Sequence, residues 1–337
     1  MSKEDILFVP QKKIFKITGK FKSMRACSFL PAATQMIYDM GLQDLLYAVT
    51  FECPKDALAE KPRAVRYVLE GNTYSSIEID RIFSASKAQG KSMYYVDDEV
   101  LQTAAPNVIF TQDVCEVCQI DTACTAAAVA KLKKKPKLVP LTPQSLHDVY
   151  ATAITIATAL GREEAAYKYL SALQKRTNAI LDKLRQAQMP LKRVMLMEWM
   201  EPIYNCGDWI PFQIAQAGGV DMLSNPSGDS IVTPWAKIVK YNPEVLVIAP
   251  CGFDVKRSTQ EIHLLTSREG WSQLEAVQNN QVFIVDFDLF TQPSAGTLVD
   301  GIEVLAALFH LDLFEVPARL KHKFVNISML KEVYAGA

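Results

Sequence analysis

Four of the seven cysteines and three glutamates fall in segments that follow predicted strands. They are Cys53, Cys115, Cys118 and Cys251, with Glu52, Glu116 and Glu198. Thiols and carboxylates placed at strand ends can bind a metal ion, act as acid and base, or position a ligand. Because the carboxyl ends of parallel strands meet at one edge of a sheet, we expect these residues to line a common site.

The pair Cys115 and Cys118 has the Cys-x-x-Cys spacing, which serves zinc, an iron–sulfur cluster or dithiol redox chemistry. A structural zinc site needs two further ligands, and the sequence has neither a second Cys-x-x-Cys nor a histidine pair at zinc-site spacing. A metal ion at Cys115 and Cys118 and a pair of free thiols both remain open. We expect Cys27, Cys124 and Cys206 to be small buried side chains.

Aromatic side chains accompany these groups. Trp199, Trp209 and Phe253 could offer flat surfaces to a large planar ligand. The sequence contains no Gly-x-Gly-x-x-Gly, Walker, Gly-x-Ser-x-Gly or His-Glu-x-x-His motif, which excludes the commonest nucleotide-binding, hydrolase and zinc-protease sites. Gly218-Gly219 is best explained as the end of a helix.

Two series of short apolar runs predict the elements that would position these residues. In the first half the predicted strands are 25–29, 45–50 and 108–111, with helices at 34–40 and 76–83. In the second half the predicted strands are 193–198, 245–249 and 281–285, with helices at 212–217, 235–240 and 271–277. This alternation is typical of an α/β fold with mainly parallel sheets.

Between the two series lies a helical segment. Residues 144–160 and 162–188 are rich in Ala, Leu, Lys, Arg and Glu, and Gly161 separates them. Apolar residues recur at helical spacing in 162–188, so we expect one long helix with a buried stripe. The predicted organisation is an N-terminal α/β lobe at 1–140, a linking helical spine at 141–190 and a C-terminal α/β lobe at 191–337.

Composition and charge exclude several classes of protein. The 337 residues carry 36 Lys and Arg against 37 Asp and Glu, so no overall field favours nucleic acid as a partner. The basic run at 131–137 is interpreted as a solvated helix end. We find no transmembrane segment and no signal peptide within the first 30 residues, and we therefore expect a cytoplasmic protein.

The segment 25–34, Arg-Ala-Cys-Ser-Phe-Leu-Pro-Ala-Ala-Thr, resembles the opening of the substrate-binding proteins of iron-chelate and cobalamin ABC importers. The motifs at 52–54, 111–118, 198–199, 207–211, 217–219 and 250–254 are similar to the branch usually labelled cobalamin-binding. The resemblance runs from about residue 24 to 314. It implies a two-lobe fold around a spine helix and a corrinoid or other metal chelate as the ligand in the cleft between the lobes.

The segments 28–34 and 249–254 also follow predicted strands, so Pro31, Ala32 and Gly252 join the cysteines, glutamates and aromatic residues named above as expected ligand-binding residues. Three departures from the branch matter. Phe51 replaces a histidine before the Glu-Cys pair, so no histidine there can reach a metal. The lack of an export signal, and Trp235-Ala236-Lys237 where the second lobe would offer an acidic residue, argue against docking on an ABC permease, although Asp80 fits in the first lobe.

Three functions follow from these residues. The first is a binding protein for a corrinoid or another metal chelate, which we expect to be non-enzymatic. The alternative is a cytosolic thiol-dependent metal-binding or corrinoid-processing protein that uses the Cys and Glu side chains of the cleft. The third is an iron-chelate or haem receptor, for which Arg63 and Arg66 are the only basic groups that we can name near the site.

Overall fold

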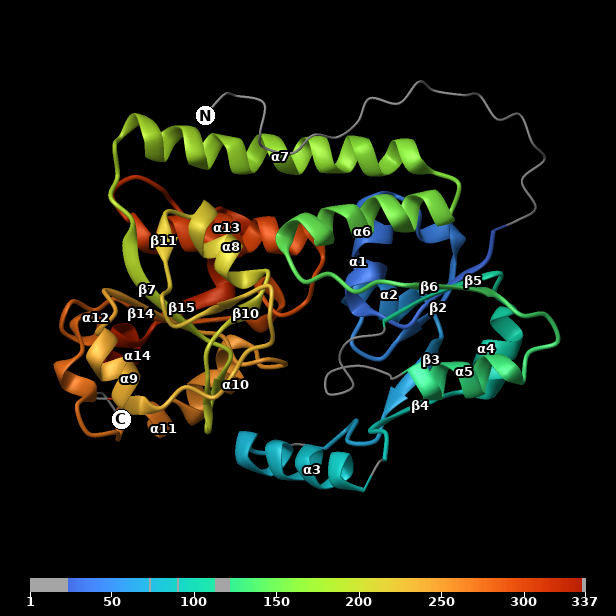
Figure 1. Cartoon of the computed structure of the whole chain (residues 1–337), viewed down its shortest axis with the longest axis horizontal. Coiled ribbons are helices and arrows are strands. Elements are labelled where there is room, and N and C mark those ends of the chain that lie inside the picture. The colour runs from blue at the N-terminus through green and yellow to red at the C-terminus, as the bar shows by residue number, and fades with distance from the viewer. Residues whose placement is uncertain (1–23, 73, 90, 113–121, 335–337) are drawn as a thin grey trace. The chain divides into compact units, whose positions relative to one another are not determined.

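A computed structural model describes residues 24–72, 74–89, 91–112 and 122–334 (Figure 1). By its internal contacts the chain forms two units. The first unit comprises residues up to Thr142 together with Tyr150–Ser171, and the second comprises Pro143–Val149 and the chain from Ala172 onward. The predicted division at residues 140 and 190 stays a prediction.

The first unit is built on a six-stranded sheet with the order β4-β3-β2-β1-β5-β6, parallel except for β4. The strands are β1 (Ala26–Ser28), β2 (Leu46–Thr50), β3 (Arg63–Tyr67), β4 (Tyr94–Val96), β5 (Val108–Thr111) and β6 (Lys137–Pro140). The helices are α1 (Pro31–Asp39), α2 (Lys55–Glu60), α3 (Ser76–Ala88), α4 (Asp98–Ala104), α5 (Thr122–Ala130) and most of α6 (Leu146–Ala159). The three strands predicted for this half are present, whereas the sequence pattern does not predict β3, β4 and β6. Charged residues interrupt the apolar pattern of β3 and begin β6.

The second unit holds a five-stranded sheet with the order β11-β7-β13-β14-β15, parallel except for β15. Its strands are β7 (Lys192–Met197), β11 (Gly219–Val220), β13 (Val245–Ile248), β14 (Val282–Val285) and β15 (Phe324–Asn326). Short pairs add β8 (Trp199–Met200) with β9 (Ile203–Tyr204), and β10 (Gly207–Asp208) with β12 (Asn225–Pro226). The helices are α8 (Ile210–Gln216), α9 (Trp235–Tyr241), α10 (Val255–Glu261), α11 (His263–Thr266), α12 (Glu275–Gln278), α13 (Ala295–Phe309) and α14 (Ile327–Tyr334).

Helix α7 (Glu163–Gln186) is the long helix that the sequence predicts. Its residues up to Ser171 belong to the first unit and those from Ala172 to the second. Ala166 and Leu170 of the predicted stripe are buried in the first part of the helix, and Ile180 and Leu184 in the second. The α/β fold with two lobes and a long helix is therefore confirmed.

Local sequence signals set several helix ends. Asp97 accepts hydrogen bonds from the backbone N–H groups of Glu99 and Val100 at the start of α4, and Asp254 accepts one from Arg257 at the start of α10. These caps satisfy N–H groups that have no partner within the helix. Gly218 follows the end of α8 with φ +82°, which confirms the predicted helix end at Gly218-Gly219.

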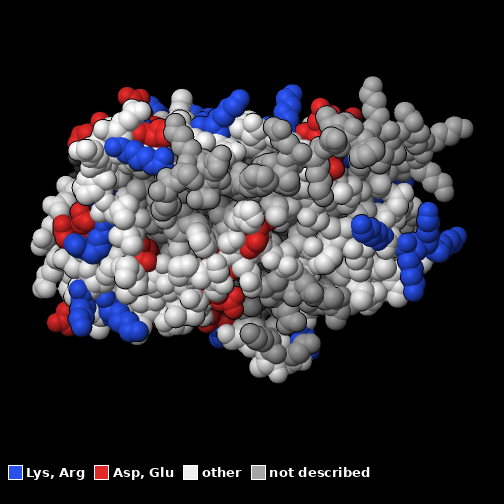
Figure 2. All heavy atoms as spheres, turned by 45° about the horizontal axis from the view of Figure 1, so that its top comes forward, with Lys and Arg blue, Asp and Glu red and all other residues white. Residues whose placement is uncertain are grey.

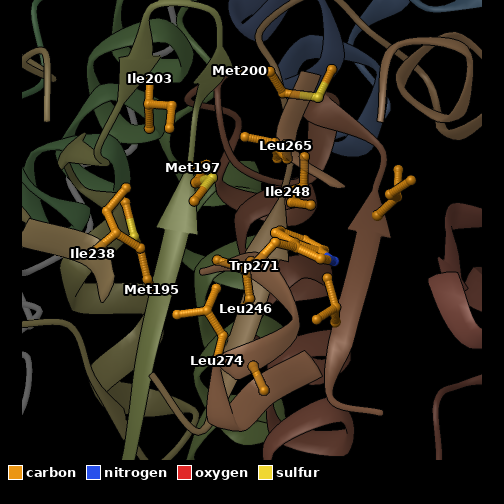
Figure 3. Packing of buried hydrophobic residues seen from close by; sticks show 13 residues of the cluster. Met195, Met197, Met200, Ile203, Ile238, Leu246, Ile248, Leu265, Trp271 and Leu274 are labelled. Atoms are coloured by element: carbon orange, nitrogen blue, oxygen red, sulfur yellow. The ribbon is translucent and has the colours of Figure 1, made fainter. Parts of the chain in front are cut away.

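A hydrophobic core lies between the sheet and the helices of the second unit (Figure 3). Met195 and Met197 of β7 and Leu246 and Ile248 of β13 pack there with the ring of Trp271. These strands are buried on both faces, as the continuous apolar runs predict. The core makes the sheet a firm base for the segments that leave its carboxyl edge.

Charged side chains of both signs share the surface, and none of the described helices combines the length and apolarity needed to cross a membrane. Figure 2 shows Lys and Arg beside Asp and Glu along the left and upper edges of one face, with a group of basic side chains at the right edge. Lys133, Lys134 and Lys135 of the predicted basic run are exposed, and Lys131 pairs with Asp98. The run is the solvated helix end that the sequence predicts.

Candidate ligand-binding site

In the second unit the segments after β7 and β13 lie side by side. The two strands are parallel neighbours, and beyond them the N–H of Cys251 donates to the carbonyl of Glu198 over 3.0 Å. Two of the predicted site residues are thus joined through their backbones. Gly252 follows with φ +81°, and this left-handed turn lets the chain leave the sheet edge for α10.

Two predicted aromatic residues meet at this edge. The rings of Trp199 and Phe253 lie with their centroids 5.2 Å apart and tilted by 52°. The indole Nε1 of Trp199 donates to the carbonyl of Glu201 over 3.1 Å, which fixes the orientation of the ring. Phe253 is buried, whereas Trp199 is half-buried. A tilted aromatic pair with one partly exposed ring is a surface suited to an apolar or planar ligand.

One cation contacts Phe253 of this pair. The guanidinium of Arg257 stands 4.8 Å from the ring centroid of Phe253 and donates to Glu261 over 2.7 Å. Its charge is therefore balanced inside the second unit, and the aromatic surface itself carries no net charge from this residue.

Glu198 is the most unusual carboxyl of the second unit. Its Oε1 accepts a hydrogen bond of 3.0 Å from the N–H of Gly207, and Asp208 follows directly. Burial, with a smaller contribution from the charge of Asp208, raises the pKa of Glu198 to about 7, while the bond from Gly207 opposes the shift. A carboxyl that holds its proton near neutral pH can donate a hydrogen bond to a ligand as well as accept one.

Glu198 should make stability depend on pH. The folded protein retains a proton that the unfolded chain releases above about pH 4.5, so the free energy of unfolding should fall as pH rises from about 4.5 to 7. We expect Glu198→Gln, which keeps an acceptor for Gly207 and removes the charge, to be more stable than the wild type by about 2 kcal/mol at pH 8. Urea unfolding at pH 5 and pH 8 measures this.

Replacement of exposed Glu315 by glutamine serves as the control and should leave the pH dependence of the wild type intact. Burial also raises the pKa of Asp221, to about 6. Both variants should therefore still show a smaller fall of the free energy of unfolding with pH. If the free energy of unfolding of Glu198→Gln falls with pH as steeply as that of the wild type, Glu198 does not titrate between about pH 4.5 and 7.

Trp209 lies in the interior of the second unit. It precedes α8, only 9% of its surface is exposed, and its Nε1 donates to the carbonyl of Phe290 over 2.6 Å. This contact holds α8 against the segment before α13. The ring thus packs within the unit rather than beside Trp199 and Phe253.

In the first unit the ends of β1 and β2 also come together. Pro31 and Ala32 begin α1 and are buried, and the thiol of Cys53 donates to Thr34 Oγ1 over 3.1 Å. Burial raises the pKa of Cys53 to about 12, so its sulfur is a protonated thiol. Glu52, next to it, is exposed.

An aromatic cluster that the sequence pattern does not reveal lies beside this loop. Phe51 stacks on Tyr67 at a centroid distance of 5.3 Å, and Tyr67 stacks on Tyr94 at 5.2 Å and on Phe83 at 6.3 Å. Tyr67 and Tyr94 are directly opposite in the antiparallel pair β3–β4. The departure at Phe51 is thus explained by packing: the ring extends the hydrophobic core of this unit.

The remaining predicted groups divide into two sets. Cys115, Glu116 and Cys118 lie outside the described residues, so a metal ion there stays a prediction. Within the part of the chain that the structure describes, no three His, Cys, Asp or Glu side chains are grouped so as to hold a metal ion. Arg63 and Arg66 both pair with Glu70, at 3.2 Å and 2.8 Å.

Comparison with known proteins agrees with this architecture. A family model described as periplasmic binding protein matches residues 34–289. The chain belongs to the periplasmic binding protein family. It is 24% identical over 313 residues to the uncharacterized ABC transporter substrate-binding lipoprotein YvrC of Bacillus subtilis strain 168, with 89% of this chain and 84% of the relative covered.

Solved structures share the fold. A periplasmic heme binding protein from Pseudomonas aeruginosa superimposes with a TM-score of 0.64 at 15% identity, covering 88% of this chain and 96% of that one. The periplasmic vitamin B12 binding protein BtuF of Vibrio cholerae does so with a TM-score of 0.55 at 18% identity, covering 85% and 96%.

These relatives correct one prediction. The family is that of periplasmic binding proteins, and the relatives include a lipoprotein and periplasmic proteins, which points to a place outside the cytoplasm. The prediction of a cytoplasmic protein is wrong. It rested on the composition of the first 30 residues, and the family relationship overrides it.

Proposed function

We propose that this protein binds a metal chelate as the cargo of an ABC importer and that the chelate is a corrinoid. The observation that carries the proposal is the tilted pair of Trp199 and Phe253 at the carboxyl ends of β7 and β13, where α/β proteins bind ligands. The named ligands of the relatives, heme and vitamin B12, are both large metal chelates with broad apolar faces. An ABC permease is the partner that such a cargo requires. The lack of an export signal no longer speaks against this partner, because the cytoplasmic prediction is wrong, whereas Trp235-Ala236-Lys237 still lacks the acidic residue expected in the second lobe.

Charge favours a corrinoid over haem. Haem carries two carboxylates that need cations, and Arg63, Arg66 and Arg257 each pair with a glutamate. A corrinoid presents mainly neutral amides at its edge. Glu198, with its pKa raised to about 7, can exchange hydrogen bonds with amides as donor or acceptor.

The thiol-dependent alternative depends mainly on Cys115 and Cys118, which lie outside the described residues, so the structure bears only on its other cysteines. Cys53 is a buried thiol bonded to Thr34, and burial raises the pKa of Cys206 well above the usual value. The thiolate is the form that attacks an electrophile or binds a metal. Neither of these cysteines is therefore suited to that chemistry, and no observation on the described residues favours it over ligand binding.

Titration of the purified protein with hydroxocobalamin tests the proposal, with haemin and ferrichrome as competing chelates. We expect saturable binding of hydroxocobalamin with a Kd of about 1 µM or tighter, seen in the corrin absorbance and in quenched tryptophan fluorescence. The variant Trp199→Phe should lose a large part of the quenching. Trp235→Phe, a half-buried tryptophan on α9 that stacks on Trp271, is the matched control and should retain it.

If haemin or ferrichrome binds more tightly than hydroxocobalamin, that chelate, and not a corrinoid, is the ligand. Failure of all three to bind would contradict the proposal.

A further inference from the structure

The hairpin β8–β9 separates its side chains into an inner and an outer face. Trp199 pairs with Tyr204, and Met200 pairs with Ile203. Met200 and Ile203 are buried and belong to the core of the second unit, where Figure 3 shows them at the upper end of the cluster. Because successive residues of a strand point to opposite faces, Trp199 and Tyr204 point away from this core.

A third segment extends the outer face. Residues 231–233 run antiparallel to β9, with Val232 directly opposite Tyr204. The N–H of Asn205 donates to the carbonyl of Ile231 over 3.1 Å, and that of Thr233 donates to the carbonyl of Ile203 over 2.8 Å. By alternation Val232, which is 51% exposed, lies on the outer side, and buried Thr233 and 54% exposed Ile231 lie on the opposite side.

Trp199, Tyr204 and Val232 therefore form one row across three strands, here called the outer row. Side-chain hydrogen bonds fix the positions of the segments that carry it. The carboxamide of buried Asn205 accepts from the N–H of Ile231 and donates to the carbonyl of Leu223, which holds the third segment in place. The bond from Trp199 to Glu201 holds the first residue of the row.

The outer row continues the aromatic site. At one end Trp199 contacts Phe253, and Glu198 directly precedes the row. At the other end Val232 offers an exposed branched aliphatic side chain. The row carries no charge, and its three side chains span the breadth of three strands, about 10 Å at the usual spacing. Those dimensions match the apolar face of a tetrapyrrole-sized chelate.

We infer that the outer row contacts the apolar face of the bound metal chelate, so that Tyr204 and Val232 determine which chelates bind. The inference rests on the proposed function. It adds two residues to the site, and it assigns an occupant to a surface that would otherwise expose a valine and part of two aromatic rings to water.

The test compares variants in the hydroxocobalamin titration. Val232→Asp places a charge on an exposed position of the row and should weaken binding about ten-fold or more. Tyr204→Ala should weaken it about five-fold and Tyr204→Phe should leave it unchanged, because the ring supplies the contact. Ile231→Asp is the matched control: Ile231 is 54% exposed on the adjacent position but alternates to the other side of the strand, so binding should be unaffected.

The relative affinities of these variants for hydroxocobalamin can overturn the inference. Equal affinities of Val232→Asp and the wild type, or equal losses in Val232→Asp and Ile231→Asp, would overturn the inference while leaving the proposed function intact. A ligand-free wild type that is dimeric by light scattering and becomes monomeric in Val232→Asp, with unchanged affinity, would assign the row to a second copy of the chain and overturn the inference. A wild type that binds none of hydroxocobalamin, haemin and ferrichrome would overturn the proposed function and the inference together.

Discussion

Replacement of Gly207 by alanine should lower the free energy of unfolding by about 3 kcal/mol. A Cβ atom at this position would lie 2.4 Å from the carbonyl oxygen of Gly228, 2.5 Å from the N of Ser230 and 2.7 Å from the carbonyl carbon of Asp229. All three are backbone atoms, so no side chain can rotate to relieve the overlap. The segment 228–230, which follows β12, has to move away from β10 instead.

The substitution should also weaken chelate binding, since the N–H of Gly207 holds Glu198 in place. Thermal and urea unfolding, followed by the hydroxocobalamin titration, measure both effects. Gly252→Ala is the matched control: no atom lies within 4 Å of the added Cβ, and only the positive φ of +81° opposes it. Its cost should be about 1 kcal/mol. Equal stabilities of the two variants would show that the segment 228–230 moves aside without strain.

Replacement of Asp221 by alanine should have an effect of similar size, about 3 kcal/mol. Strand β11 pairs with β7 only as far as Val220 opposite Arg193. Beyond that point the carboxylate of Asp221 replaces the missing strand: it accepts from the N–H of Leu196 over 3.0 Å and from that of Leu223 over 2.9 Å. Without it, both N–H groups lose their partner in a largely buried place.

Asp221→Asn should cost less, because one amide oxygen can still accept one of the two bonds while the NH2 group faces the other N–H. Asp229→Ala, at an exposed aspartate nearby, is the control and should change the free energy of unfolding by less than about 0.5 kcal/mol. Guanidinium unfolding at pH 7 gives all three values. If alanine at 221 proves as stable as asparagine, water must satisfy the N–H groups in place of the carboxylate.

The period of the hydrophobic pattern and the length of each element explain which elements could be predicted. Strands β5, β7, β13 and β14 are continuous apolar runs, and the sequence places them to within a residue at either end. Helix α7 is long enough for its stripe to repeat over several turns. The two-residue strands β8 to β12 are too short for any period to appear, although Glu201-Pro202 between two apolar pairs is a turn signal that could have revealed the β8–β9 hairpin.

The candidate site was predictable where it depends on topology. The rule that ligands gather at the carboxyl ends of parallel strands identifies Glu198, Cys251 and Phe253 as neighbours, and the structure joins them. It does not reveal Tyr204 or Val232, which reach the same surface through hairpin register. Nor does sequence tell that Trp209 turns inward, because its partner, the carbonyl of Phe290, lies 81 residues further along the chain.

Helix α7 has a consequence for how the protein folds during synthesis. Its buried stripe begins among residues of the first unit and ends among residues of the second, at Leu184, which lies beside the Gly218 turn. The first unit can thus complete its share of the helix before the second has left the ribosome, while the other half has no surface on which to bury Ile180 and Leu184. Since helix formation is cooperative along a continuous segment, loss of either half also weakens the other. We expect cooperative melting of both units, and a cut at Ser171, inside the helix, should yield two fragments that each expose apolar surface and aggregate.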